Sequence, residues 1–170
     1  MDPRVSLRQV TPEIRPVAER LWQLYRHDLS EFRGTLPDEA GTFPLRRLAP
    51  FFSDLDRCGY LIYRGTSPSG LALVSGVSEE PRMMAEFFVV RAVRRQQVGH
   101  EAMLQLFGMH PGRWEIAFQE ANTGSARFWR RVATAVAGDG WSEEPRPVPG
   151  KPEIAPDVWI TLQAQGVRAR

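Results

Sequence analysis

The feature of this 170-residue sequence that most restricts its fold is a block of three strand-like runs between residues 59 and 90. The runs GYLIYRG (59–65), GLALVSGVS (70–78) and MMAEFFVV (83–90) are rich in β-branched and aromatic residues. The segments between them, TSPSG and EEPR, are too short for a crossover but suit turns. We therefore expect these runs to form an antiparallel meander.

After the meander, helix-like and strand-like patterns alternate. Apolar residues recur at helical spacing in 94–110 and 122–137, whereas 113–119 and 157–164 have the short apolar runs of strands. A helix between the strands 83–90 and 113–119 makes this unit a right-handed crossover with parallel strands. The sheet is thus predicted to be mixed.

Before the meander, the pattern predicts a strand at 5–10 and a long helix over 11–32. Thr11 suits the N-cap position of this helix, and Pro12 suits its first turn. A short helix is predicted within 44–56, after a loop that is rich in glycine and proline.

The rest of the chain is predicted to connect or end these elements. The proline-rich segment 145–156 is expected to be an extended connector, and 165–170 a loose tail. Because 42% of the residues are apolar, the chain can form a core of its own. We therefore expect a single domain over residues 1–170, an α/β fold with a mixed, mostly antiparallel sheet and flanking helices.

Composition argues against several classes of protein. The formal net charge is only +2, and Lys151 is the single lysine among 22 basic residues, a skew that coding bias explains better than nucleic-acid binding. Cys58 is the one cysteine, which excludes an intrachain disulfide, and no His or Cys cluster has metal-ligand spacing. No apolar run is long enough to span a membrane. We expect a cytoplasmic protein without metal, membrane or nucleic-acid partner.

The turn RRQQVG, residues 94–99, has features of a phosphate site. It leads into a predicted helix, whose first N–H groups are unpaired and favour anions. Arg94 and Arg95 add positive charge, and Gly99 is expected to let a phosphate approach the backbone because it has no Cβ. The sequence has neither G-x-G-x-x-G nor G-x-x-x-x-G-K-[ST]. A pyrophosphate such as that of coenzyme A suits this turn.

These residues resemble a signature of the GNAT superfamily of N-acetyltransferases. In that family a strand ending in valine is followed by [Q/R]-x-x-G-x-[G/A] at the start of a helix, and here Val89, Arg94 and Gly99 match, with Gln97 in place of the middle glycine. The segment NTGSARFW is similar to a second family motif, with Trp129 in place of a tyrosine. The resemblance covers about residues 3–164.

The resemblance implies a GNAT-like acyl-CoA N-acyltransferase fold with acetyl-coenzyme A as co-substrate. The residues that it places at the cofactor are Val89, Val90, Arg91, Arg94, Arg95, Gln96, Gln97, Val98, Gly99, His100, Asn122, Ser125, Phe128 and Trp129. We expect Gln97 to be helical, where glutamine is harmless. Indole cannot protonate the departing thiolate as the family's tyrosine does, so Trp129 implies that the thiolate leaves unaided or is protonated from elsewhere.

Two carboxylates are candidates for the base that takes a proton from the acceptor amine. Glu86, three residues before Val89 on the same predicted strand, is preferred, and Glu120 is the reserve. If the resemblance holds, the first helix borders the acceptor site, and its residues predicted to contact the substrate are Tyr25, Asp28 and Glu31. His110 precedes a Pro-Gly stop and is expected to be a cation at a helix end.

The sequence therefore predicts an N-acetyltransferase that moves an acetyl group to an amine by direct attack on the thioester. The alternative is a non-catalytic domain that binds or senses an acyl-coenzyme A. The acceptor is expected to be a small-molecule or peptide amine that the sequence does not specify further, and a homodimer is left open.

Overall fold

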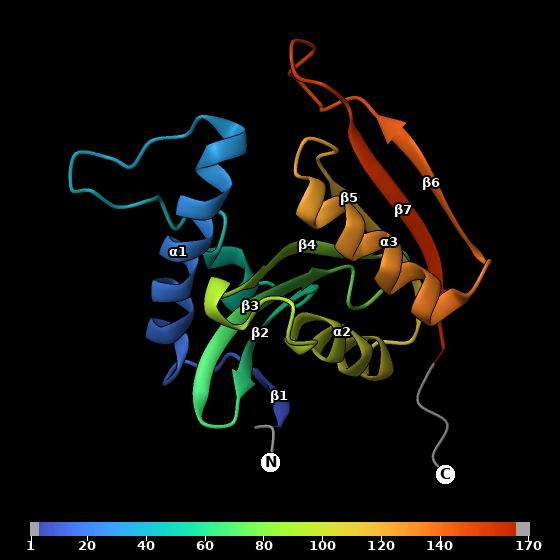
Figure 1. The fold of residues 1–170 in the computed structure, drawn as a ribbon. Helices are drawn as coiled ribbons and strands as arrows, with labels where there is room; N and C mark the ends of the chain where they lie inside the picture. The colour runs from blue at the N-terminus through green and yellow to red at the C-terminus, as the bar shows by residue number, and fades with distance from the viewer. Residues whose placement is uncertain (1–3, 166–170) are drawn as a thin grey trace.

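The structure, a computed structural model, describes residues 4–165 (Figure 1). In this part of the chain seven strands form one sheet in the order β1-β2-β3-β4-β5-β7-β6. The strands are β1 (Val5–Gln9), β2 (Arg57–Arg64), β3 (Ser67–Ser75), β4 (Arg82–Val89), β5 (Gly112–Phe118), β6 (Trp141–Arg146) and β7 (Asp157–Ala164). The helices are α1 (Arg15–Arg33), α2 (Val98–Met109) and α3 (Thr123–Ala137), with short 3-10 turns η1 (Ala49–Phe52) and η2 (Arg91–Val93).

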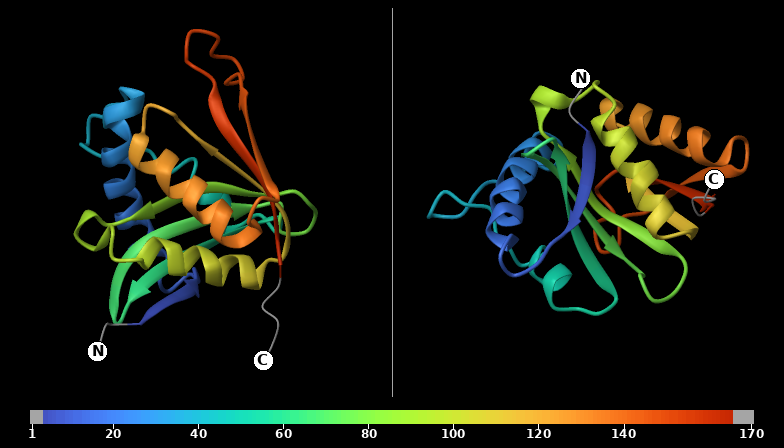
Figure 2. Two further views of the ribbon diagram at one scale, coloured as in Figure 1. Left: turned by 45° about the vertical axis from the view of Figure 1, so that its right-hand side comes forward. Right: turned by 90° about the horizontal axis from the view of Figure 1, so that it is seen from below.

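The pairing of the strands confirms the predicted mixed sheet. All neighbouring strands are antiparallel except β4 and β5, which are parallel and are joined through α2. Helix α1 covers one face of the sheet, and α2 and α3 cover the other (Figure 2). The predicted tail lies almost wholly outside the described residues.

Each face of the sheet has its own core. On one face, Trp22 of α1 is fully buried against β2 and β3, because the apolar residues of α1 recur every three or four positions. Its indole Nε1 donates to the carbonyl of Pro44 at 3.1 Å, which fixes the loop after α1 to the helix. On the other face, Trp114 and Met103 are fully buried between the sheet and the helices α2 and α3.

The sheet opens between its two halves. β4 and β5 pair only between 82–84 and 114–116. Beyond Met84, β4 stays paired with β3 as far as Val89, and β5 stays paired with β7 as far as Phe118, but the two strands no longer pair with each other (Figure 1). Within residues 4–165, the edge of β4 therefore has no strand partner on this side, next to the start of α2.

The predicted start of the first helix is wrong. α1 begins at Arg15 with Ile14 as the N-cap, and Thr11 has no capping role; its carbonyl accepts the N–H groups of Ile14 and Arg15 in a preceding turn. Pro16 explains the shift. In a helix beginning at residue 12, its ring would clash with the preceding turn, whereas near the N-terminus it is tolerated.

Two strand predictions also need correction. The turn between β2 and β3 consists of residues 65–66 only, so most of the predicted turn TSPSG belongs to β3. β6 was not predicted, and it includes the first residues of the expected connector 145–156. The sequence does not predict this strand, because its charged residues and proline (Glu143, Glu144 and Pro145) lack a strand-like apolar pattern. β6 pairs only with β7, and such a composition is typical of a strand at the edge of a sheet.

The prediction that His110 is a cation at a helix end is also wrong. Its Nε2 lies 2.7 Å from the hydroxyl of Tyr60, and its carbonyl accepts the indole N–H of Trp114 at 2.8 Å. Burial, and then the positive charge of Arg82, lower the pKa of His110 below its ordinary value. The imidazole is therefore neutral at physiological pH. Cys58 is a buried free thiol.

Candidate functional site

The unpaired edge of β4 exposes backbone groups to the opening in the sheet. The N–H of Val90 donates to the carbonyl of Ser69 at 2.8 Å, so this residue faces β3. Since backbone groups alternate along a strand, those of Val89 and Phe87 face the opening instead. The carbonyl of Val89 accepts Nε of Arg94 at 2.7 Å, which confirms that it points away from β3.

The segment between β4 and α2 reverses direction through two left-handed residues. Arg94 is extended, whereas Arg95 has φ 62° and Gln97 has φ 63°. The expectation that Gln97 is helical is therefore wrong: it is the N-cap, and α2 begins at Val98. The left-handed turn brings the chain from the end of β4 into the axis of α2, at a cost of about 1–2 kcal/mol for a residue with a Cβ.

This segment has a row of unsatisfied N–H groups. Within the described residues, no acceptor is bonded to the N–H groups of 95–99, and the first bond of α2 runs from Glu101 N to Gln97 O at 2.9 Å. Arg94 is different, because its N–H donates to the carbonyl of Arg91 at 3.2 Å. Successive amides in such a turn form a concave anion site, and the helix dipole favours negative charge there.

Glycine is needed at position 99 for a different reason from the expected one. A Cβ at this position would lie 3.2 Å from the ring of Phe128 and 3.4 Å from Cγ2 of Val89, so protein atoms already occupy the Cβ side of this residue. The glycine lets α2 pack closely on α3 and β4. The aromatic neighbour Phe128 stacks on Phe87 with ring centroids 5.5 Å apart.

The other predicted cofactor residues differ in their surroundings. Trp129 is 4% exposed and packs edge-on against Phe87, so its side chain belongs to the core. Oδ1 of Asn122 caps α3 by accepting the N–H of Ser125 at 3.1 Å. Val98 is also buried, so only its backbone N–H faces the turn. Contacts of these residues with a cofactor stay predictions.

On the α1 face, Glu86 is held by two donors from distant parts of the chain. Tyr25 of α1 donates its hydroxyl to Oε2, and Arg47 donates Nη2 to Oε1 at 2.8 Å. The side chain of Glu86 is 10% exposed, whereas that of Arg47 is 65% exposed. Burial, and then the charge of Glu86, raise the pKa of Tyr25 well above its ordinary value, so the phenol keeps its proton.

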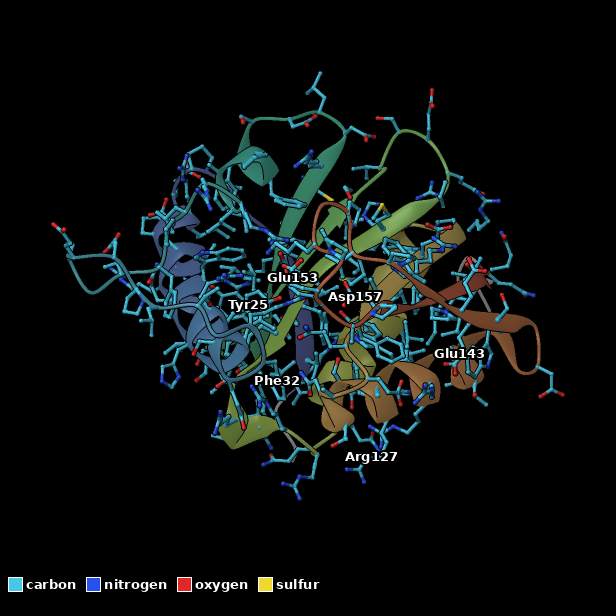
Figure 3. All side chains as sticks on the ribbon, turned by 90° about the horizontal axis from the view of Figure 1, so that it is seen from above. Tyr25, Phe32, Arg127, Glu143, Glu153 and Asp157 are labelled. Carbon is cyan, nitrogen blue, oxygen red and sulfur yellow. The ribbon has the colours of Figure 1, made fainter. Side chains whose placement is uncertain are left out.

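Tyr25 lies on the side of α1 that faces the sheet (Figure 3). Its ring contacts Trp22 and Phe88, with ring centroids 5.5 and 5.9 Å away. The predicted base and one predicted substrate residue are thus brought together. Arg47 was not singled out from the sequence, since its contact with Glu86 spans 39 positions and leaves no local pattern.

Asp28, predicted as a substrate residue, contacts two arginines of the predicted cofactor site. Nη2 of Arg91 lies 2.9 Å from Oδ1, and Nη2 of Arg94 pairs with Oδ2. Burial alone would raise the pKa of Asp28, but hydrogen bonds from these arginines outweigh it and hold the pKa below its ordinary value. Glu31 is exposed near the end of α1. Asp28 thus ties α1 to the turn before α2.

Glu120, the reserve base, is a weaker candidate than Glu86. It follows β5 and forms a two-pronged pair with Arg130 at 3.0 and 2.8 Å. The hydrogen bond from Arg130 lowers the pKa of Glu120, which makes this carboxylate a poorer proton acceptor.

No group of three or more His, Cys, Asp or Glu side chains in residues 4–165 is arranged to hold a metal ion. Within the same residues, none of the helices combines the length and apolar character that crossing a bilayer requires.

Neither a protein-family model nor a curated protein sequence matches this chain. Its fold, however, is similar to that of solved acetyltransferases. An acetyltransferase from Thermus thermophilus is 17% identical with TM-score 0.70, covering 96% of this chain and 99% of its own. An acetyltransferase of the GNAT family from Staphylococcus aureus is 8% identical with TM-score 0.61, covering 95% of this chain and 100% of its own.

A third structure, the IAA acetyltransferase from Bacillus cereus, is 11% identical with TM-score 0.60 and covers 94% of this chain and 99% of its own. The fold of the chain is therefore an acyltransferase fold. More specifically, it is the fold of the GNAT-family acetyltransferases, which confirms the expected fold. At these low identities the likeness establishes the fold and leaves the activity to be argued from the site.

Proposed function

We propose that this protein transfers an acetyl group from acetyl-coenzyme A to an amine. The observation that carries the proposal is the row of amides at 95–99, which have no acceptor among residues 4–165, beside the opening between β4 and β5. Backbone donors at a helix N-terminus suit a diphosphate, and an unpaired strand edge suits the amides of a pantetheine arm. Acetyltransferases with this fold support the same reading.

The residues present fit coenzyme A. The diphosphate would be held by the amides of 95–99, with positive charge from Arg91, Arg94 and Arg95. The pantetheine arm would pair with the groups of Val89 that face the opening. Because Arg94 occupies the carbonyl of Val89 in this structure, its guanidinium would have to move toward the diphosphate.

The chemistry would be a direct attack. The neutral amine nitrogen bonds to the thioester carbonyl carbon, the C–S bond breaks, and the second proton that the nitrogen loses passes through water to the departing thiolate. The N–H of Val89 faces the opening and would polarise the carbonyl, whereas that of Val90, also expected at the cofactor, is used in pairing with β3. Before the attack, Glu86 would accept one proton from the acceptor ammonium and so free the nitrogen lone pair, with Tyr25 orienting its carboxylate.

A second candidate function is a domain that binds acyl-coenzyme A without catalysis. It is favoured by Trp129, which fills the core where a proton donor would be expected and offers no acid to the leaving thiolate.

Thiol release from acetyl-coenzyme A in the presence of a panel of amines tests the proposal. We expect release with some amines, and a decrease of about a hundredfold or more in kcat on Glu86→Gln. Glu120→Gln is the matched control and should change kcat little. In both variants coenzyme A should still raise the melting temperature. Stabilisation by coenzyme A without thiol release for any amine would favour the non-catalytic alternative.

A further inference from the structure

We propose that the acceptor is a free α-amino acid, whose ammonium group binds at Glu86 and whose carboxylate binds at Arg47. This inference rests on the proposed acetyl transfer and names the substrate class for that same site. It begins from the ion pair in which Nη2 of Arg47 lies 2.8 Å from Oε1 of Glu86.

The position of this pair suits an acceptor site. Glu86 lies on β4 two residues beyond Met84, the last β4 residue that pairs with β5, and its side chain contacts Tyr25 on the α1 face. The amides proposed for the diphosphate precede α2, which covers the other face. An acceptor reaching Glu86 from the α1 side would therefore meet the thioester without crossing the diphosphate site.

The exposed guanidinium of Arg47 favours an acceptor that carries an anion. Arg47, the guanidinium that contacts Glu86, is largely exposed and can pair with a second carboxylate. The carboxylate of an amino acid would make this charge-assisted contact, which a simple amine lacks.

The geometry of the pair favours a short zwitterion. Arg47 uses one of its five N–H donors on Glu86, and its side chain is 65% exposed. Its planar guanidinium can therefore donate further hydrogen bonds to a carboxylate that arrives from solvent. The carboxylate of Glu86 accepts one bond on each oxygen and keeps lone pairs for an ammonium. Opposite charges 2.8 Å apart complement a partner whose ammonium and carboxylate share one carbon.

The test compares matched compounds. Glycine, leucine, phenylalanine and glutamate are each offered as the free amino acid and as the amide that lacks the α-carboxylate charge. For the best acceptor we expect kcat/KM to be tenfold to a hundredfold higher for the acid, about the value of one charge-assisted contact. Arg47→Gln should abolish this preference, Arg47→Lys should keep part of it, and the neighbouring Arg46→Gln should leave it unchanged.

Calorimetry separates failure of this inference from failure of the proposed function. Titration of the protein–coenzyme A complex with the acid and the amide measures the same preference without chemistry. A preference for the acid that Arg47→Gln removes supports the inference, even if no thiol is released. Equal binding of acid and amide by the unaltered protein would overturn it. A preference for the acid that survives in Arg47→Gln would overturn it as well. A coenzyme A-dependent rise in melting temperature in each variant shows that the variants fold.

Discussion

Gln97 is held at φ 63°, a backbone conformation that glycine adopts freely and glutamine does not. Because the side chain is exposed, its replacement removes strain and little packing. We expect Gln97→Gly to raise the free energy of unfolding by about 0.5–1 kcal/mol, the relief of strain less the greater entropy of the unfolded glycine. Urea unfolding followed by circular dichroism measures this change.

The adjacent Gln96 is the matched control, since it is exposed and is not among the described residues with positive φ. Its Nε2 donates to the carbonyl of Ala92 at 2.9 Å. Gln96→Gly should lower the free energy of unfolding by about 0.5–1 kcal/mol. Equal effects of both replacements would contradict the left-handed turn before α2.

His110 gives the protein a pH-dependent contribution to stability. Its folded pKa lies below the ordinary value of 6.5, so the unfolded chain binds a proton first as the pH falls. The contribution is complete above pH 6.5 and is lost as the pH falls below it toward the folded pKa, with a slope of at most about 1.4 kcal/mol per pH unit. We expect His110→Gln to show a shallower decrease over this range than the wild type.

Urea midpoints measured at several pH values in both proteins test this prediction. The carboxylates titrate in both, so the difference between the two curves isolates the imidazole. Parallel curves would show that His110 is protonated equally well in the folded and unfolded states, against its burial beside Tyr60.

At the scale of elements, the contact between α2 and α3 depends on Gly99. Alanine favours a helix by about 1 kcal/mol over glycine, yet its Cβ would press on a Phe128 ring that Phe87 already confines. We expect Gly99→Ala to lower the free energy of unfolding by about 1 kcal/mol. In the background of Phe128→Leu, where the ring is gone, the same change should be neutral or stabilising, as a double-mutant cycle would show.

Periodic elements of this chain could be predicted, because their signals are local. The meander of β2 to β4 and the crossover through α2 follow from apolar patterns and short turns. β6 is not predicted, because an edge strand needs no alternation of apolar and polar residues. The start of α1 is predicted too early, because Pro12 and Pro16 both resemble first-turn residues. Arg47 could not be found, since only the fold brings it to Glu86.

In the whole molecule, the two halves of the sheet are joined by the short parallel pairing of β4 with β5, and the opening beyond it leads to the turn at 95–99. The amides of 95–99 have no acceptor within the described residues, so we expect them to exchange hydrogen rapidly in the free protein. Coenzyme A should slow this exchange by at least tenfold. Hydrogen exchange read by mass spectrometry or NMR measures it.

Pantetheine, which lacks the diphosphate, separates the two parts of the proposed site. It should protect the amide of Val89, whose backbone faces the opening, and leave 95–99 unchanged. A diphosphate bound at the start of α2 requires this division, because the two sets of amides contact different parts of the ligand. Protection of 95–99 by pantetheine alone, or none by coenzyme A, would place the diphosphate elsewhere and remove the main support for acetyl transfer.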